Sequence, residues 1–161
     1  MKDWKRYKVE VFRHEIAEAK PTRIERPTAA VDFFRQDAER LMNESLWVMT
    51  LDGRNGILGV EQVYSGTATG TSVRIGELFR YAVAAGGCAI LLAHNHPSGD
   101  PEASNEDINL TKEVIAASSL LDIAVLDHLV IGGGGAFTSI RSQRPSLWEG
   151  VEDGVRTSIT Q

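Results

Sequence analysis

The sequence predicts an α/β fold, a sandwich of helices and strands built around a mixed sheet. Its 161 residues suit a single domain with a full core. Segments with strand alternation and segments with helical periodicity take turns along the chain. The segment CAILLA at 88–93 is apolar at every position, as expected of a central strand that is covered on both faces. Alternating elements of this kind pack as layers with the sheet inside.

Three parts are expected along the chain. Residues 1–27 form an N-terminal arm and linker with a strand over 6–12, residues 28–144 form the domain, and residues 145–161 form a C-terminal tail without periodicity. The expected elements of the domain are helices at 28–41, 75–85 and 104–121 and strands at 46–52, 57–64, 88–93, 123–131 and 136–140.

Local signals support these elements. Thr28 is expected to cap a helix whose buried stripe is Val31, Phe34, Ala38 and Leu41. The turn residues GRNG join the first two strands of the domain as a hairpin. Two glycines end the second helix, and the tetraglycine at 132–135 joins the last two strands.

Composition excludes several classes of protein. A net charge of -5 and a pI near 5.4 argue against nucleic-acid binding by charge alone. Cys88 is the only cysteine, so an intrachain disulfide and a Cys-rich zinc site are excluded. The charged N-terminus does not resemble a secretory signal, and the longest apolar run is too short to span a bilayer. We therefore expect a cytoplasmic protein without a membrane partner.

The stretch HNHPSGDPEASNED at 94–107 concentrates the chemistry of the chain. His94 and His96 lie two residues apart at the end of a strand, so both imidazoles are expected on one face. The prolines and glycine that follow predict a loop, which ends where a helix begins at Ser104. The two ring nitrogens are therefore expected to converge beside a helix N-terminus.

Asp107 has two interpretations. A stripe of Leu110, Val114, Ala117 and Leu121, extended backward by three residues, places Asp107 on the inward face of its helix. Ser104-x-x-Asp107 is also a helix-capping pattern, which is the better interpretation of the acid taken alone. Beside two imidazoles, however, this carboxylate completes the ligand set of an open catalytic zinc site.

Glu61 is the candidate general base. Strand alternation places it on the same face as Ile57, Gly59 and Val63, toward an apolar layer that would raise its pKa. The alternative is a glutamate on an edge strand that faces solvent.

Together, Glu61, His94-x-His96-Pro-Ser and Ser104-x-x-Asp107 resemble the metal-binding signature of the JAMM, or MPN+, metal-dependent hydrolases. The string HNHPSGDPEAS, with SGT at 65–67 and LDHLVIG at 126–132, resembles the RadC-like branch, over roughly residues 40 to 142. The resemblance implies the JAB/MPN fold, a three-layer α/β/α sandwich around a mixed sheet that is related to the fold of cytidine deaminases.

The resemblance also implies roles for individual residues. His94, His96 and Asp107 would hold one zinc ion per chain, Glu61 would be the general base, and the Ser104 hydroxyl would stabilise the oxyanion. His128 matches the family's Leu-Asp-His segment and would contact a metal ligand and hold it in place, or be a core histidine without a role there. The sequence departs from the family at 75–77, where Ile-Gly-Glu replaces a frequent Pro-Arg-Glu.

Three functions follow as hypotheses. The first is a zinc-dependent hydrolase that cleaves a peptide, isopeptide or other amide bond of a protein or peptide substrate. The second is a non-catalytic module of the same fold that binds a protein or DNA partner. A DNA-repair role rests on family naming alone, since residues 1–39 leave no room for the helix-hairpin-helix of fuller members. A zinc deaminase is excluded because one cysteine cannot supply its Cys-x-x-Cys pair. The sequence leaves the oligomeric state open.

Overall fold

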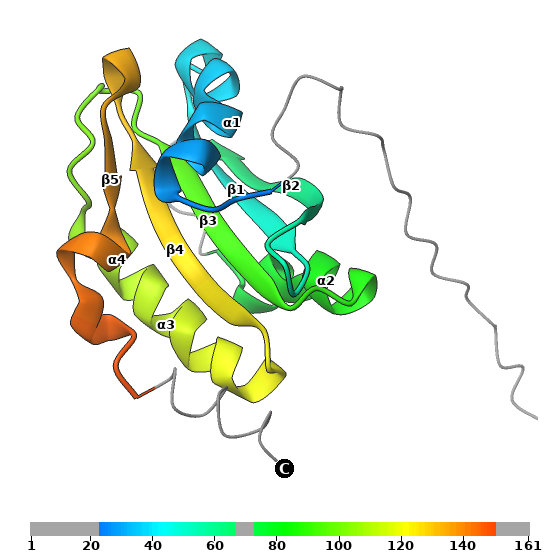
Figure 1. Ribbon diagram of the computed structural model, residues 1–161. Coiled ribbons are helices and arrows are strands. Elements are labelled where there is room, and N and C mark those ends of the chain that lie inside the picture. The colour runs from blue at the N-terminus through cyan, green and yellow to red at the C-terminus, as the bar shows by residue number, and fades with distance from the viewer. Residues whose placement is uncertain (1–22, 67–72, 151–161) are drawn as a thin grey trace, which may run out of the picture.

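A five-stranded mixed sheet forms the centre of the molecule, which is a computed structural model described here for residues 23–66 and 73–150 (Figure 1). The strands are β1 (Glu44–Leu51), β2 (Ile57–Gly66), β3 (Ala89–Asn95), β4 (Ala124–Ile131) and β5 (Phe137–Ser139), in the order β2-β1-β3-β4-β5. β3 and β4 are parallel, and the other neighbours are antiparallel. The predicted hairpin and the fully buried central strand are confirmed.

Helices cover both faces of this sheet. α1 (Pro27–Arg40) packs on one face, while α2 (Ile75–Ala85) and α3 (Asn105–Leu121) pack on the other (Figure 1). Each face has its own apolar core, and the residues of β1, β3 and β4 alternate between the two. The expected three-layer α/β/α sandwich is therefore confirmed.

The antiparallel pairing of β1 with β3 fixes where the functional residues meet. Leu46, near the start of β1, lies opposite His94, near the end of β3. Asn95 strengthens this junction, because its side chain accepts a hydrogen bond from the Ser45 amide at 2.8 Å and donates one to the Asn43 carbonyl at 3.1 Å. The first residues of β1 are thereby held beside the histidines.

α1 begins one residue earlier than the sequence suggests. Pro27 occupies the first turn and Arg26 is the N-cap, without a side-chain capping bond, so the expected capping role of Thr28 is wrong. The fixed φ of proline and its missing N–H suit the first turn of a helix, which explains the earlier start. The predicted strand over 6–12 lies outside the described residues.

α3 buries a different stripe from the expected one. Its inward residues are Asp107, Ile108, Thr111, Val114, Ile115 and Ser118. Leu110 and Ala117 are only half-buried, and Leu121 is 43% exposed. Thr111 and Ser118 donate their hydroxyl protons to backbone carbonyls of the helix itself, at 2.6 and 2.7 Å. Polar side chains satisfied in this way can be buried, and an apolar periodicity does not reveal them.

Packed structure continues past the domain boundary expected at residue 144. A short α4 (Ile140–Gln143) and a 3₁₀ turn at Pro145–Leu147 lead to Trp148, which is 5% exposed and belongs to the core on the α2–α3 side. The Trp148 indole N–H donates to the Val125 carbonyl at 2.7 Å. A single aromatic anchor produces no periodicity, which is why the sequence suggested an unpacked tail from residue 145.

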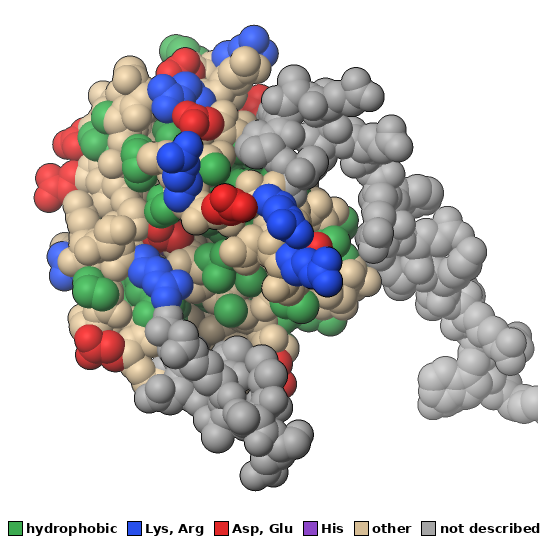
Figure 2. All heavy atoms as spheres, in the orientation of Figure 1, with side chains coloured by type: hydrophobic (Ala, Val, Ile, Leu, Met, Phe, Trp, Pro, Cys, Tyr) green, Lys and Arg blue, Asp and Glu red, His purple; other side chains and the backbone are tan. Residues whose placement is uncertain are grey.

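Charges of both signs share the face that carries α1. Figure 2 shows Lys and Arg side chains with Asp and Glu side chains between them, and no histidine is visible on this face. Among the described residues, no helix combines the length and the apolar character needed to cross a membrane. Because the two signs are mixed in Figure 2, this face of the molecule shows no extended surface of one charge.

Trp148→Ala is expected to lower the free energy of unfolding by about 3–5 kcal/mol, because it removes a large buried ring and leaves the Val125 carbonyl without its donor. Urea unfolding followed by circular dichroism measures this loss. Met42→Ala is the control, since Met42 is 89% exposed and should change stability little. Equal stability of the two variants would show that the segment after residue 144 is not part of the fold.

Candidate metal centre

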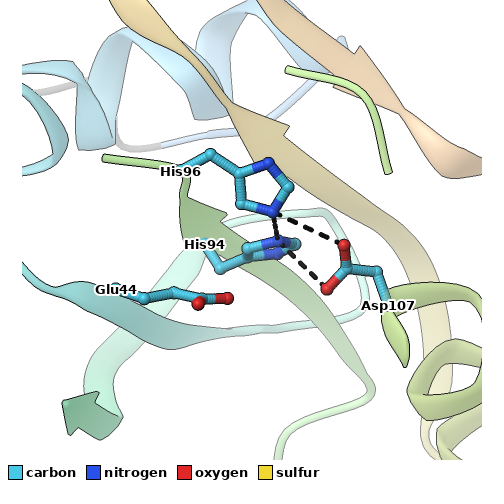
Figure 3. A group of neighbouring side chains, drawn as sticks. All are labelled: Glu44, His94, His96 and Asp107. Atoms are coloured by element: carbon cyan, nitrogen blue, oxygen red, sulfur yellow. Dashed lines mark hydrogen bonds and ion pairs between the residues drawn. The ribbon is translucent and has the colours of Figure 1, made fainter. Parts of the chain in front are cut away.

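Four potential metal donors meet at the end of β3 where β1 begins (Figure 3). Glu44 is the first residue of β1, His94 lies in β3, His96 follows the strand directly, and Asp107 is in the first turn of α3. One ligand atom from each residue lies within 4.8 Å of the others. The fold therefore collects two imidazoles and two carboxylates from three separate elements.

The three residues expected to share a metal are brought into contact. The Nε2 atoms of His94 and His96 are 3.0 Å apart. Asp107 Oδ1 lies 3.2 Å from His94 Nε2, and Asp107 Oδ2 lies 3.5 Å from His96 Nε2. Both histidines therefore present the same ring nitrogen toward one carboxylate (Figure 3).

The loop after β3 orients His96. Its Nδ1 lies 2.9 Å from the Asp100 carbonyl oxygen, and its amide donates to the Ile131 carbonyl. The tetraglycine packs against this loop: the Gly133 amide donates to the Gly99 carbonyl, and a Cβ atom on Gly132 would lie 2.5 Å from that same oxygen. The glycines therefore form the expected turn and also allow a close approach that positions His96.

Asp107 satisfies both interpretations of its position. Ser104 and Asp107 form a capping box, in which the Ser104 amide and hydroxyl both donate to Asp107 Oδ2 at 2.7 Å. The other carboxylate oxygen of Asp107, Oδ1, contacts His94 Nε2. Burial alone would raise the pKa of Asp107, but its contacts with His94 and His96 and the hydrogen bonds donated by Ser104 outweigh burial and hold that pKa well below its usual range. The carboxylate is therefore a fixed anion.

A buried hydrogen-bond chain fixes the tautomer of His94. The only hydroxyl proton of Thr111 is donated to the Asp107 carbonyl at 2.6 Å, so Thr111 Oγ1 must accept from His128 Nδ1, which lies 2.7 Å away. Burial lowers the pKa of His128 to about 3, so this ring is neutral and its Nε2 is an acceptor. His94 Nδ1, at 2.9 Å, is then the donor, which leaves a lone pair on His94 Nε2.

His96 reaches the same state by a simpler route. The Asp100 carbonyl can only accept a hydrogen bond, so His96 Nδ1 carries the proton and Nε2 has the lone pair. Two nitrogen lone pairs that meet at 3.0 Å require a positive charge between them. In the metal-free protein a proton can supply it, and the hydrogen bond to Asp107 is the main reason that the pKa of His96 is raised.

A divalent cation fits the same three donors. Tetrahedral zinc with ligand bonds of about 2.0–2.1 Å keeps its donors about 3.3 Å apart. The three separations here are 3.0, 3.2 and 3.5 Å. The second ring nitrogen of each histidine is hydrogen-bonded, as is usual for imidazoles that bind metals. The residues can therefore hold a metal ion with little rearrangement.

The structure does not bring Glu61 to this cluster. Glu61 lies on β2, two strands from His94, and its carboxylate forms an ion pair with Arg80 of α2. Its side chain does face the α2–α3 side of the sheet, as expected. Glu61 lies opposite Val48 of β1, which lies opposite Leu92 of β3, and both Val48 and Leu92 belong to the core on that side. The carboxylate next to the histidines belongs to Glu44, which sequence reasoning missed.

Ser104 and His128 occupy the surroundings of the donors. Ser104 lines a cavity of about 700 Å³ that opens at the cluster, while its hydroxyl is hydrogen-bonded to Asp107. Its role in stabilising an oxyanion stays a prediction. His128 is fully buried and contacts His94, which is the arrangement expected of a residue that supports a ligand.

Thr111→Val is expected to weaken zinc affinity about tenfold or more, because the valine cannot accept the His128 Nδ1 proton and the tautomer of His94 is no longer fixed. Thr111→Ser keeps the hydroxyl and should bind zinc as the wild type does. Competition with a chromophoric chelator measures both affinities, and circular dichroism checks that the variants are folded. If the valine and serine variants bind zinc equally, the hydrogen-bond chain does not position His94.

Comparisons with known proteins agree with this site. The family model for the RadC-like JAB domain matches residues 24–145. A UPF0758 protein of Trichodesmium erythraeum is 42% identical over 126 residues, which cover 78% of this chain and 51% of the relative. A UPF0758 protein of Roseiflexus castenholzii is 43% identical over 120 residues, which cover 74% of this chain and 51% of the relative. The chain spans about half the length of these curated relatives, and it belongs to the RadC-like JAB domain family.

Proposed function

We propose that this chain is a metal-dependent hydrolase of the JAMM type that cleaves a peptide, isopeptide or other amide bond of a protein or peptide. The observation that carries the proposal is the meeting of two imidazole Nε2 atoms with the Asp107 carboxylate, beside a second carboxylate, at the end of a cavity. A non-catalytic module that kept a structural metal would need the three donors but would have no use for Glu44 beside them.

Zinc is the metal we propose, one ion per chain, held by His94, His96 and Asp107. Two of the three donors are imidazoles, which favour zinc over magnesium or calcium, and no cysteine thiolate is needed. A bound zinc ion would polarise the carbonyl of the substrate and lower the pKa of a water molecule that it holds. We also propose a cytoplasmic location, because a chain with one cysteine is compatible with a reducing compartment.

Glu44 is the residue that we propose as general base, in place of Glu61. Its carboxylate is half-buried at the start of β1, within 4.8 Å of the ligand atoms of both histidines. From there it can take a proton from the attacking water and return it to the leaving nitrogen. None of the described residues forms an ion pair with Glu44, whereas the carboxylate of Glu61 is engaged by Arg80.

Ser104 and Asp107 would act together at the attacked carbonyl. The Ser104 hydroxyl is held at 2.7 Å from Asp107 Oδ2, at the rim of the cavity. Rotation of this hydroxyl away from Asp107 would let it donate to the developing oxyanion, while the Ser104 amide continues to hold the carboxylate. The capping box thus keeps the metal ligand in place during the step.

Glu44→Gln is expected to retain zinc and fold but to lower kcat about 10²- to 10⁴-fold, because the amide cannot accept a proton. Glu61→Gln is the matched control and should keep the wild-type rate. Initial rates of zinc-loaded protein on quenched fluorescent peptides and an isopeptide-linked substrate measure both effects.

The control variant also decides between the two glutamates. Loss of activity in Glu61→Gln with normal rates in Glu44→Gln would identify Glu61 as the general base and contradict the proposal. Zinc-loaded wild type that hydrolyses no substrate of the set would instead favour the non-catalytic module.

A further inference from the structure

We infer that the substrate is a polypeptide with a Lys or Arg side chain beside the cleaved bond, seated in the groove along α3. This inference rests on the proposed hydrolase function, because it concerns the cavity of about 700 Å³ that opens at the metal cluster. The cavity lies between the outer side of α3 and a wall formed by β1, β2 and the segment before α2.

The α3 side of the cavity is acidic. Glu106 and Glu113 both line it, and seven helical residues place their Cα atoms about 10.5 Å apart along the axis on the same side. Neither carboxylate forms an ion pair with a described residue. Besides the proposed metal ligand Asp107, Glu44 adds a third carboxylate at the inner end, and none of the described residues that line the cavity is Lys or Arg. A positively charged group would therefore meet carboxylates that no described residue pairs with.

The opposite side of the cavity is largely apolar. Leu46, Tyr64 and Val73 line it, and Leu110 lies between the two glutamates of α3. Lys and Arg side chains combine an apolar stem with a charged end. Such a stem can pack between Leu110 and the apolar wall while its charged end reaches Glu106 or Glu113. The combination of the two walls fits a basic side chain better than a purely apolar or an acidic one.

The same charges disfavour a nucleic acid in this cavity. Away from the proposed metal, a phosphate backbone would bring its negative charges next to Glu106 and Glu113, and no Lys or Arg among the described lining residues would neutralise them. Peptides therefore fit the cavity better than DNA, and among peptides those with a positive charge near the scissile bond should bind best.

The test compares three peptides that differ only beside the bond, with Lys, Gln or Glu at that position. Their affinities are measured by fluorescence anisotropy on the zinc-loaded Glu44→Gln variant, so that binding is read without turnover. The Lys peptide should bind about tenfold more tightly than the Glu peptide at low salt, and the difference should shrink in about 0.5 M salt.

Two double variants locate the effect. Glu106→Gln with Glu113→Gln should abolish the preference for the Lys peptide. Glu25→Gln with Glu39→Gln removes the same charge from exposed positions before and on α1, which packs on the opposite face of the sheet, and should leave the preference intact. Equal binding of all three peptides, no binding of any, or the same change in both double variants would overturn the inference.

Cleavage by the wild type separates this inference from the proposed function. Cleavage of all three peptides at equal efficiency would support the hydrolase and overturn the charge preference alone. A charge preference in binding without cleavage of any peptide would support the cationic site and contradict the hydrolase.

Discussion

The contact between the Nε2 atoms of His94 and His96, 3.0 Å apart, is the constraint on which the site depends. The lone pairs of two neutral imidazoles repel each other at this distance. Such a contact therefore needs a fold that holds the rings in place and a cation that removes the repulsion. Here β3 and its loop impose it, and hydrogen bonds at both Nδ1 atoms prevent either ring from turning away. The fold thus holds lone pairs together at a cost that a bound metal would offset.

α3 shows how one helix can serve several tasks through its period. Its first turn supplies Asp107 and the Ser104 cap, one turn further Thr111 supports His128, and the outer side presents Glu106 and Glu113 to the cavity. Residues four apart lie on one face, so the ligand and the residue that supports the His94 tautomer are stacked on the inward side. The metal cluster and the groove are therefore built on the same rigid element.

Local signals in the sequence predicted the layered fold and the meeting of His94, His96 and Asp107, because alternation, helix caps and short spacings are local properties. Sequence analysis did not identify Glu44, because the position of this residue depends on the register of β1 against β3, which pairs residues far apart in the chain. Alternation correctly placed Glu61 on the inner face of β2 but could not reveal its distance from His94 or its ion pair with Arg80. The burial of Thr111 and Trp148 was missed for a related reason, since it depends on partners elsewhere in the fold rather than on periodicity.

X-ray absorption at the zinc edge of the zinc-loaded chain is the sharpest test of the shared metal site, because it reports the atoms around the metal. We expect zinc bound by two imidazole nitrogens, with oxygen as the remaining donors, at about 2.0–2.1 Å. His96→Ala should reduce the imidazole count to one. A shell that contains sulfur, or a shell with one imidazole or none in the wild type, would contradict the claim that His94, His96 and Asp107 share a metal.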